Sequence, residues 1–259
     1  TLITSSAASD VYKRQGENSN HWYYEVFKLL EENNIGWNFW THKKVDKITS
    51  PYSALVTPQY QVIIDYLRGV AEQPDPNIAG MGLTSFANSL KIENCITRPG
   101  VIASLTDPEY GEISKPYTTH SIPGTIPAAY YDIGARGLSY SDSDYWNDGD
   151  GGYNDGWVFR NDGVDVEGSD DDPNIPYTVG WTEAGEWLGY TIEDVLPGTY
   201  DVSFSISAPN AGGIFYAQLS GQNLGVIDVP SPGGWYNWDD IQSQRIEITE
   251  GEKFLKIQI

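Results

Sequence analysis

Tryptophans flanked by glycine are the residues of this sequence best suited to chemistry at a surface. Trp235 and Trp238 follow a Pro-Gly-Gly turn, and Trp181 follows Gly180 in a polar segment. A tryptophan in a loop presents a large, flat apolar face that attracts C–H groups. The apolar face of a pyranose ring carries such groups, so these positions indicate stacking on sugars. We expect Trp181 and Trp235 to be exposed, whereas Trp238 fits a surface and a core position equally well.

Two carboxylates, Glu183 and Glu186, are a second candidate for chemistry. As a catalytic pair they would have to lie side by side, but residues three apart on a strand face opposite sides of a sheet. They could converge only in a turn, so catalysis by this pair is the weaker hypothesis. Trp187 opens a predicted strand at 187–192, and we expect it in the core.

An acidic segment at 142–172 holds eleven carboxylates and one arginine. Oxygen-rich loops can ligate Ca²⁺, and the candidate ligands are Asp148-Gly149-Asp150 and Asp170-Asp171-Asp172. No calcium-loop spacing recurs, so a solvated acidic loop is the favoured interpretation. The single cysteine, Cys95, excludes an intrachain disulfide and a cysteine-based zinc site.

Composition excludes several classes of partner. The 259 residues include 36 acidic and 15 basic side chains, for a formal net charge of −21. This acidity argues against binding to nucleic acid or to anionic lipid. We therefore expect no nucleic-acid partner. No stretch approaches the ~20 apolar residues of a membrane span, so we also expect no membrane insertion.

Charge also divides the chain. Residues 1–120 carry a net charge of −3, whereas residues 121–259 carry −18 and six of the nine tryptophans. The segment 115–124 has the proline and hydroxyl content of a linker, and we place a boundary near Ser121. Residues 1–15 resemble a translated sequencing adapter, and we expect an unstructured scar joined to a natural chain that is truncated before Gly16.

Residues 16–69 predict a piece of an α/β fold. Apolar residues at helical spacing from Trp22 to Leu30 predict a helix that Asn18, Ser19 or Asn20 caps and that ends at 33–34. Residues 35–40 are short, aromatic and strand-like. A second helix is predicted from the N-cap Thr57 to Gly69, with a buried stripe of Tyr60, Ile63, Ile64 and Leu67. Shorter helices are predicted at 79–90 and 101–105, in a helical or linker region at 70–121.

Residues 122–259 predict an all-β domain. Apolar and polar residues alternate at 200–206 and again at 245–248, which indicates strands with one buried face. A Glu-Gly turn at 250–251 leads into a further strand at 254–259. Several short strands with frequent glycine and proline turns are typical of a β-sandwich.

Five motifs identify a family for this domain: Ile122-Pro123-Gly124-Thr125-Ile126, Tyr131-Asp132, Gly180-Trp181-Thr182-Glu183-Ala184-Gly185-Glu186-Trp187, Pro197-Gly198-Thr199-Tyr200 and Gly233-Gly234-Trp235. With them, residues 122–259 resemble a family 6 carbohydrate-binding module. The resemblance implies a jelly-roll sandwich in which two loop aromatics, Trp181 and Trp235 in this sequence, enclose one sugar ring. Trp238 and Tyr140 are further sugar-contact candidates. Pro127-Ala128-Ala129 replaces the family's Glu-Ala-Glu calcium ligands, and the family's last strand would lie beyond Ile259.

The N-terminal piece resembles another family. Gly16-Glu17-Asn18-Ser19-Asn20 and the segment from Asn34 to Lys44 look like the end of a family 5 glycoside hydrolase, a (β/α)8 barrel that cleaves β-glycans through two glutamates. Glu17 could be the nucleophile, but the Asn-Ser-Asn that follows fits a position just past a nucleophile already lost. Glu17 could equally be an acid at a helix N-terminus. Trp40 matches the end of strand eight, where an aromatic contacts sugar.

Together these patterns predict a monomeric polysaccharide-binding module attached to an endo-β-1,4-glycan hydrolase, with this chain catalytically incomplete. The expected ligand is cellulose-like β-glucan, with mixed-linkage glucan and xylan as alternatives. No cofactor is required, Ca²⁺ is doubtful, and the resemblance implies an extracellular or cell-surface protein. The alternative function is a calcium-dependent or protein-binding adhesion module without a sugar role, which calcium-dependent melting would distinguish.

Overall fold

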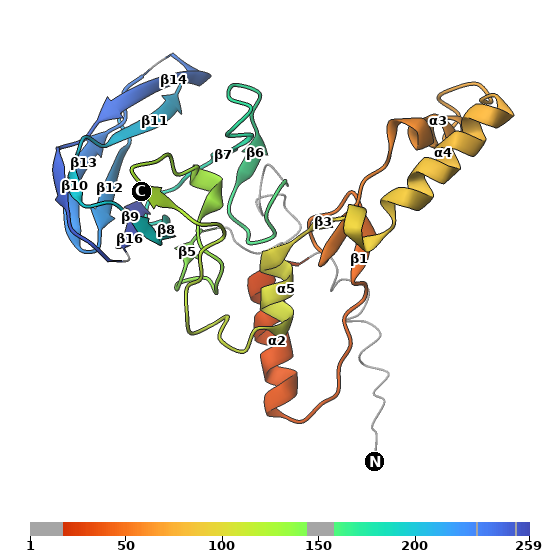
Figure 1. The fold of residues 1–259 in the computed structure, drawn as a ribbon, viewed down its shortest axis with the longest axis horizontal. Coiled ribbons are helices and arrows are strands. Elements are labelled where there is room, and N and C mark those ends of the chain that lie inside the picture. Colours follow the sequence, from red (N-terminus) through yellow and green to blue (C-terminus); the bar gives the residue numbers. More distant parts are fainter. Residues whose placement is uncertain (1–17, 144–157, 232, 252) are drawn as a thin grey trace.

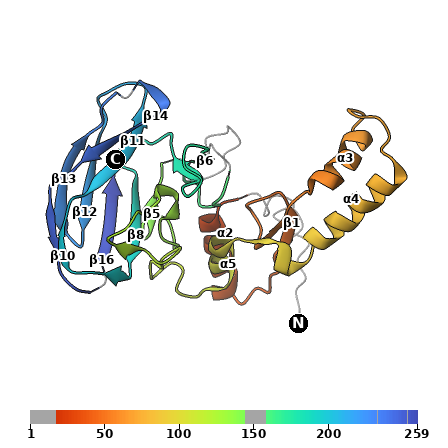
Figure 2. The same cartoon turned by 45° about the horizontal axis from the view of Figure 1, so that its top comes forward.

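A computed structural model describes residues 18–143, 158–231, 233–251 and 253–259 (Figure 1). Helices α3 and α4 lie at one end of the molecule and strands β11 to β14 at the other, with α2 and α5 between them in both views (Figures 1 and 2). Within the described part of the chain, every helix is too short or too polar to cross a membrane.

The N-terminal region consists of helices around a small sheet. Its elements are α2 (Asn20–Glu32), β1 (Lys43–Val45), β2 (Tyr52–Ala54), α3 (Pro58–Leu67), α4 (Pro76–Ser89), η2 (Ile92–Asn94), β3 (Ile96–Thr97) and α5 (Pro99–Thr106). β2 pairs with β1 in parallel and with β3 in antiparallel orientation. The predicted helices at 79–90 and 101–105 are confirmed by α4 and α5.

Helix α2 has the predicted start and end. The Ser19 hydroxyl accepts a hydrogen bond from the backbone N–H of Trp22 at 3.3 Å, and Asn33 is the C-cap. Tyr23 and Phe27 form a buried cluster with Val101 of α5. This cluster joins α2 to α5 although about 70 residues separate them in sequence.

The strand predicted at 35–40 is wrong. The segment has no regular secondary structure. Its aromatic side chains pack on α2, and its backbone does not pair with a neighbouring strand. The Trp37 ring lies 4.1 Å from that of Phe27, and the Phe39 ring lies 5.2 Å from that of Tyr23. The aromatic residues of this segment therefore indicate side-chain packing on a helix and not a β-strand.

Helix α3 is confirmed with its caps. The Thr57 hydroxyl accepts from the N–H of Tyr60 at 3.3 Å, and Gly69 has the positive φ of +73° that suits a residue after a helix. Its predicted buried stripe is wrong, because no residue of α3 is buried: Tyr60, Ile63 and Ile64 are half-buried. The Tyr60 ring stacks on Phe86 of α4 at 4.2 Å, but Leu67 in the last turn is 73% exposed.

The C-terminal region is rich in β-structure. Its elements are β4 (Ser121–Ile122), η3 (Ala128–Tyr130), β5 (Tyr140–Ser141), β6 (Val166–Gly168), β7 (Tyr177–Val179), β8 (Trp187–Ile192), β9 (Asp194–Val195), β10 (Gly198–Tyr200), β11 (Ser203–Ala208), β12 (Ile214–Leu219), β13 (Gln222–Asp228), β14 (Gly234–Gln242), β15 (Ile246–Ile248) and β16 (Lys253–Gln258). The predicted alternation at 200–206 and the strands near 246 and 254 are confirmed.

These strands form a sandwich. One layer is a five-stranded antiparallel sheet in the order β13-β12-β16-β8-β5, and the other is built from the pairs β10·β15 and β11·β14. Apolar residues of both layers meet in one core cluster, where the Phe204 ring contacts that of Phe215 edge-on at 5.1 Å. The predicted β-sandwich is thus confirmed for the C-terminal region.

A second core cluster contains a buried ion pair. Arg160 lies 2.7 Å from Asp162, and the Arg160 guanidinium lies 3.7 Å from the ring centre of Tyr131. The Pro127-Ala128-Ala129 segment leads into the short helix η3 here and does not form a strand. Burial of charged groups in this cluster is sustained because each has a partner.

The segment with linker composition is paired into this region. The backbones of Lys115 and Ile133 exchange two hydrogen bonds of 2.9 and 2.7 Å, and β4 pairs in parallel with β9. The Ser114 hydroxyl also donates to the buried Asp132 carboxylate at 2.9 Å. These contacts fix the path of the chain into the sandwich.

The pH dependence of stability should report the environment of His21 in α2. Burial lowers the pKa of His21 below 6.5, and the nearby Glu25 opposes this only in part. Below about pH 6.5 the unfolded chain therefore binds a proton that the folded chain resists, and the free energy of unfolding should fall as the pH falls. Urea titrations between pH 5 and 8 measure this.

The matched control uses the exposed His42. His21→Gln should flatten the decline below pH 6.5, whereas His42→Gln should retain it. A decline of equal size in both variants would place its origin in another group.

Candidate functional site

Aromatic side chains gather on strand β14. It begins after a turn in which Gly233 has a φ of +98°, and Trp235 is 68% exposed. Tyr236 is also exposed, and Trp238 is 37% exposed, which settles the open question for Trp238 in favour of the surface. The hydroxyl of Ser207 on β11 donates to the backbone carbonyl of Trp235 and holds the strand start in place. Three large aromatic side chains of β14 are therefore exposed to solvent.

Trp238 is fixed by a charged hydrogen bond. Its indole Nε1–H donates to Asp171 Oδ2 at 2.7 Å, and Asp171 lies in the loop between β6 and β7. The Ser169 hydroxyl donates to the same carboxylate at 3.1 Å. This bond ties the β6–β7 hairpin to β14, and no sequence pattern pointed to it.

Trp181 follows β7 and projects from a turn. It has a φ of +47° and is 50% exposed, so the expected exposure is confirmed. The preceding Gly180 N–H donates to the carbonyl of Asp165 at 3.1 Å. Because β7 belongs to the hairpin that Asp171 ties to β14, one structural unit carries both Trp181 and the partner of Trp238.

The two glutamates that follow Trp181 converge after all, in the turn and not on a strand. Glu186 is buried, and its carboxylate accepts from the Ser143 N–H at 3.0 Å, the Ser143 hydroxyl at 2.8 Å and the Glu183 N–H at 2.9 Å. Glu183 accepts from the same hydroxyl at 3.0 Å. Two of these three donors belong to Ser143, 43 residues upstream, and one to the turn itself, so the Glu186 carboxylate joins two segments and this geometry supports a structural role for Glu186.

Two predicted positions are corrected. Tyr140 is fully buried, and its hydroxyl donates to the carbonyl of Asp162 at 2.8 Å, so it cannot stack on a sugar. Burial raises the pKa of Tyr140 well above its usual value. Trp187 is not a core residue, because Leu188, Tyr190 and Ile192 of β8 face the core and the alternation turns Trp187 outward.

The outer face of the five-stranded sheet carries a smaller aromatic group. The Lys256 ammonium lies 4.2 Å from the centre of the Trp187 ring. Tyr216 on β12 is exposed, and both Tyr216 and Trp187 are in register with Gln258 of β16. Tyr216 is a candidate that the sequence reasoning missed, although the alternation along β12 signals its outward direction.

The remaining site predictions lie elsewhere. Trp40 is exposed in the N-terminal region, as expected of a surface contact. Glu17 and the Asp148-Gly149-Asp150 candidate fall outside the residues that the structure describes. Among the residues that it does describe, no group of three His, Cys, Asp or Glu side chains is placed to hold a metal ion. Calcium binding stays a prediction.

A β-sandwich with exposed aromatic side chains is the setting in which the C-terminal region is compared with known families. Residues 160–259 match the family model described as "Carbohydrate binding module (family 35)". The C-terminal region is therefore a carbohydrate-binding module. The predicted class of module is confirmed, and the family model that matches is that of family 35, whereas the sequence motifs predicted family 6.

Comparison with curated proteins finds a partial relative. Over 78 residues the chain is 32% identical to the alpha subunit of clotting factor G from Tachypleus tridentatus. The match covers 29% of this chain and spans 11% of the length of that subunit.

Solved structures that resemble the chain include three family 6 modules. A module of Cellvibrio mixtus lichenase 5A in complex with cellotriose is 26% identical, with a TM-score of 0.32, over 37% of this chain and 75% of that one. The C-terminal module of the Zobellia galactanivorans laminarinase LamC is 25% identical, with a TM-score of 0.32, over 41% and 84%. A Clostridium stercorarium module in complex with cellobiose is 22% identical, with a TM-score of 0.38, over 54% and 87%.

The Asp171–Trp238 bond yields a specific prediction. Asp171→Ala removes the acceptor, so the indole N–H of Trp238 should exchange with solvent about tenfold faster or more, as expected for loss of a hydrogen bond to a charged group. Hydrogen exchange followed by NMR measures this rate. The neighbouring Asp170→Ala removes the same charge and serves as the matched control. Equal rates in both variants would show that the bond does not persist in solution.

Proposed function

We propose that the C-terminal module binds the sugar chain of a β-glucan through the exposed aromatic faces of Trp181 and Trp235, with Trp238 as a supporting contact. The observation that carries the proposal is the exposure of these tryptophans on a domain of a carbohydrate-binding family. Exposed tryptophan has a hydration cost that a sugar face can relieve by stacking. A few hydroxyl hydrogen bonds would add modest net free energy, so weak affinity is expected.

The hydrogen bond from Trp238 to Asp171 supports this assignment. A side chain that stacks on a ligand binds better when its rotamer is already fixed, because less conformational entropy is lost on binding. Trp238 has such a restraint at its polar edge, and its ring remains partly exposed. The same contact restrains the hairpin that leads to Trp181.

The ligand that we propose first is a β-1,4-linked glucan, with mixed-linkage glucan and xylan as alternatives. The preference rests on the resemblance of residues 16–69 to the end of a family 5 glycoside hydrolase barrel. Trp40, exposed after the aromatic segment that packs on α2, supports a sugar contact in that region.

We propose further that this chain, as given, has no hydrolase activity. Retaining hydrolysis needs two carboxylates about 5 Å apart, and the resemblance supplies at most Glu17. In a longer parent enzyme, the module would hold the hydrolase near its polymer and raise its effective concentration. We also propose that the protein is monomeric and, from the same resemblance, that it acts outside the cell or at its surface.

Affinity electrophoresis of the whole chain tests the binding function. Native gels would contain hydroxyethyl cellulose, mixed-linkage glucan, xylan or laminarin, each with and without a chelator. Retardation by a β-glucan is expected, and Trp235→Ala or Trp181→Ala should weaken the apparent affinity about tenfold or more, because stacking area is lost. The free energy of unfolding should change by less than about 0.5 kcal/mol, as for other surface substitutions.

Leu196→Ala is the matched control, since Leu196 is a similarly exposed apolar residue of the same region. It should leave retardation unchanged. Unchanged migration of the wild-type chain in every gel would contradict the binding function. Collapse of stability in Trp235→Ala would instead show a structural role for that tryptophan.

A further inference from the structure

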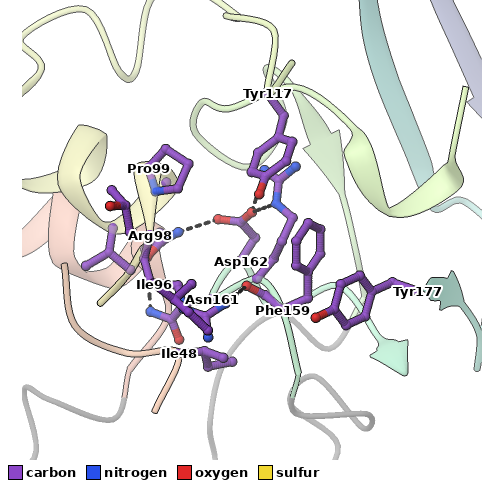
Figure 3. Close-up of a pocket in the computed structure, with 14 residues that line it drawn as sticks. Ile48, Ile96, Arg98, Pro99, Tyr117, Phe159, Asn161, Asp162 and Tyr177 are labelled. Atoms are coloured by element: carbon purple, nitrogen blue, oxygen red, sulfur yellow. Dashed lines mark hydrogen bonds and ion pairs between the residues drawn. The ribbon is translucent and has the colours of Figure 1, made fainter. Parts of the chain in front are cut away.

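The N-terminal end of α2 lies directly against the segment Phe159–Asp162 of the β-rich region (Figure 3). The backbone N–H of Asn20 donates to the carbonyl of Asn161 at 2.7 Å, and the Asn20 side-chain amide donates to Asp162 Oδ1 at 2.5 Å. In return, Asn161 Nδ2 donates to the carbonyl of Asn18 at 2.8 Å and to Asn20 Oδ1 at 3.0 Å. Four hydrogen bonds thus join segments about 140 residues apart.

These polar groups are buried at the contact. Asn20, Asn161 and Asp162 are each almost completely inaccessible to solvent. A buried amide or carboxylate that loses its partner suffers the full penalty of desolvation. Because each group is satisfied by one on the opposite segment, the two segments are complementary in their hydrogen bonding as well as in shape.

A second contact flanks the first. Arg98, the N-cap residue of α5, donates from Nη1 to the carbonyl of Phe159 at 2.7 Å. Phe159 has a φ of +66°, a conformation unfavourable for a bulky residue. Its ring stacks on Tyr177 at 4.2 Å with 16° between the planes. The docked arrangement therefore holds Phe159 in a conformation that an isolated loop would leave.

The fit is close in one place and open in another. A Cβ added to Gly100, in the first turn of α5, would lie 2.8 Å from the Asn20 amide nitrogen, so only glycine allows this approach. Next to it is a cavity of about 110 Å³, bounded by Arg98, Tyr117, Phe159 and Tyr177 (Figure 3). Helices α2 and α5 therefore meet the β-rich region as one packed pair.

We propose that Phe159–Asp162 is a docking strap, through which the N-terminal ends of α2 and α5 fix the orientation of the carbohydrate-binding module. The partner of this surface is the helical region of the same chain, recognised by Asn18, Asn20 and Arg98. The exposed aromatic side chains of β14 then keep a fixed position relative to the residues that precede the module. The module acts as a rigid extension of the helical region and not as a domain on a flexible tether.

NMR relaxation of the whole chain tests the docking. The ratio of transverse to longitudinal ¹⁵N relaxation rates should be equal, within error, for amides of α2 and α5 and for amides of β8 and β16. Different ratios in the wild-type chain would mean that the two regions tumble separately, and this result would overturn the proposal without the use of any variant.

Variants locate the joint. In the double variant Asn20→Ala/Asn161→Ala the ratios of the two regions should diverge, and amide exchange at residue 20 should accelerate about tenfold, as expected when buried hydrogen bonds are lost. Asn174→Ala is the matched control, because Asn174 is exposed and bonds only within its own turn. If the double variant behaves like this control, the strap is not the joint.

The same samples separate this proposal from the proposed function. Retardation by β-glucan should persist in the double variant, since the strap lies apart from β14 in the chain. A wild-type chain that tumbles as one body yet binds no glycan would support the docking and contradict the sugar-binding function. Retardation by glycan with separate tumbling would contradict only the docking.

Discussion

The buried pair of Arg160 and Asp162 is the interaction on which the rest of this structure depends. Burial disfavours the charged form of Arg160, yet its neighbours Tyr131 and Asp162 raise the pKa of Arg160 above that of a free guanidinium. Its other nitrogens donate to the carbonyls of Tyr131 and Asp132. An ion pair removed from water is tolerated only when all its partners are in place. The pair therefore dictates the positions of the segments around it.

Several parts of the molecule follow from that constraint. The Asp162 carboxylate accepts hydrogen bonds from the Tyr131 hydroxyl at 3.2 Å and from the Asn20 side-chain amide. Its backbone carbonyl accepts a hydrogen bond from the Tyr140 hydroxyl. One side of this cluster supports β5 and β8, while the other receives α2. The sandwich core lies beyond it, between the five-stranded sheet and the layer built from the pairs β10·β15 and β11·β14. Strand β14 lies at the margin of this core, and its aromatic side chains are exposed to solvent.

Helix caps and the alternation of apolar and polar residues are set by neighbouring residues, and these features of the fold could be predicted from the sequence. Ser19 and Thr57 mark helix starts because their hydroxyls satisfy backbone donors of the same turn. Alternation at 200–206 predicted a half-buried strand. The same rule, applied along β8, places Trp187 on the face opposite to Leu188, Tyr190 and Ile192, so that error came from giving residue type more weight than the period of the strand.

Other features depend on partners that are distant in sequence. The hydroxyl of the buried Tyr140 donates a hydrogen bond to the carbonyl of Asp162, 22 residues away in sequence. The indole of Trp238 donates a hydrogen bond to an aspartate 67 residues upstream. Nothing near either residue encodes such a contact. The aromatic segment 35–40 is another case in which a contact outside the segment decides the structure, because its rings pack on α2 and the segment forms no strand. The site could be predicted as far as exposed tryptophans between glycines, but not as far as the bonds that position them.

Contact between the exposed tryptophans of the module and sugar can be followed through their indole N–H resonances. A ¹⁵N-labelled whole chain would be titrated with cellohexaose, with each resonance assigned by Trp→Phe substitution. We expect saturable shifts for Trp235 and Trp181 and none for Trp22 or Trp37, which pack around α2. Saturable shifts confined to Trp22 and Trp37, or none at any tryptophan with cellohexaose, xylohexaose or laminarihexaose, would contradict this contact.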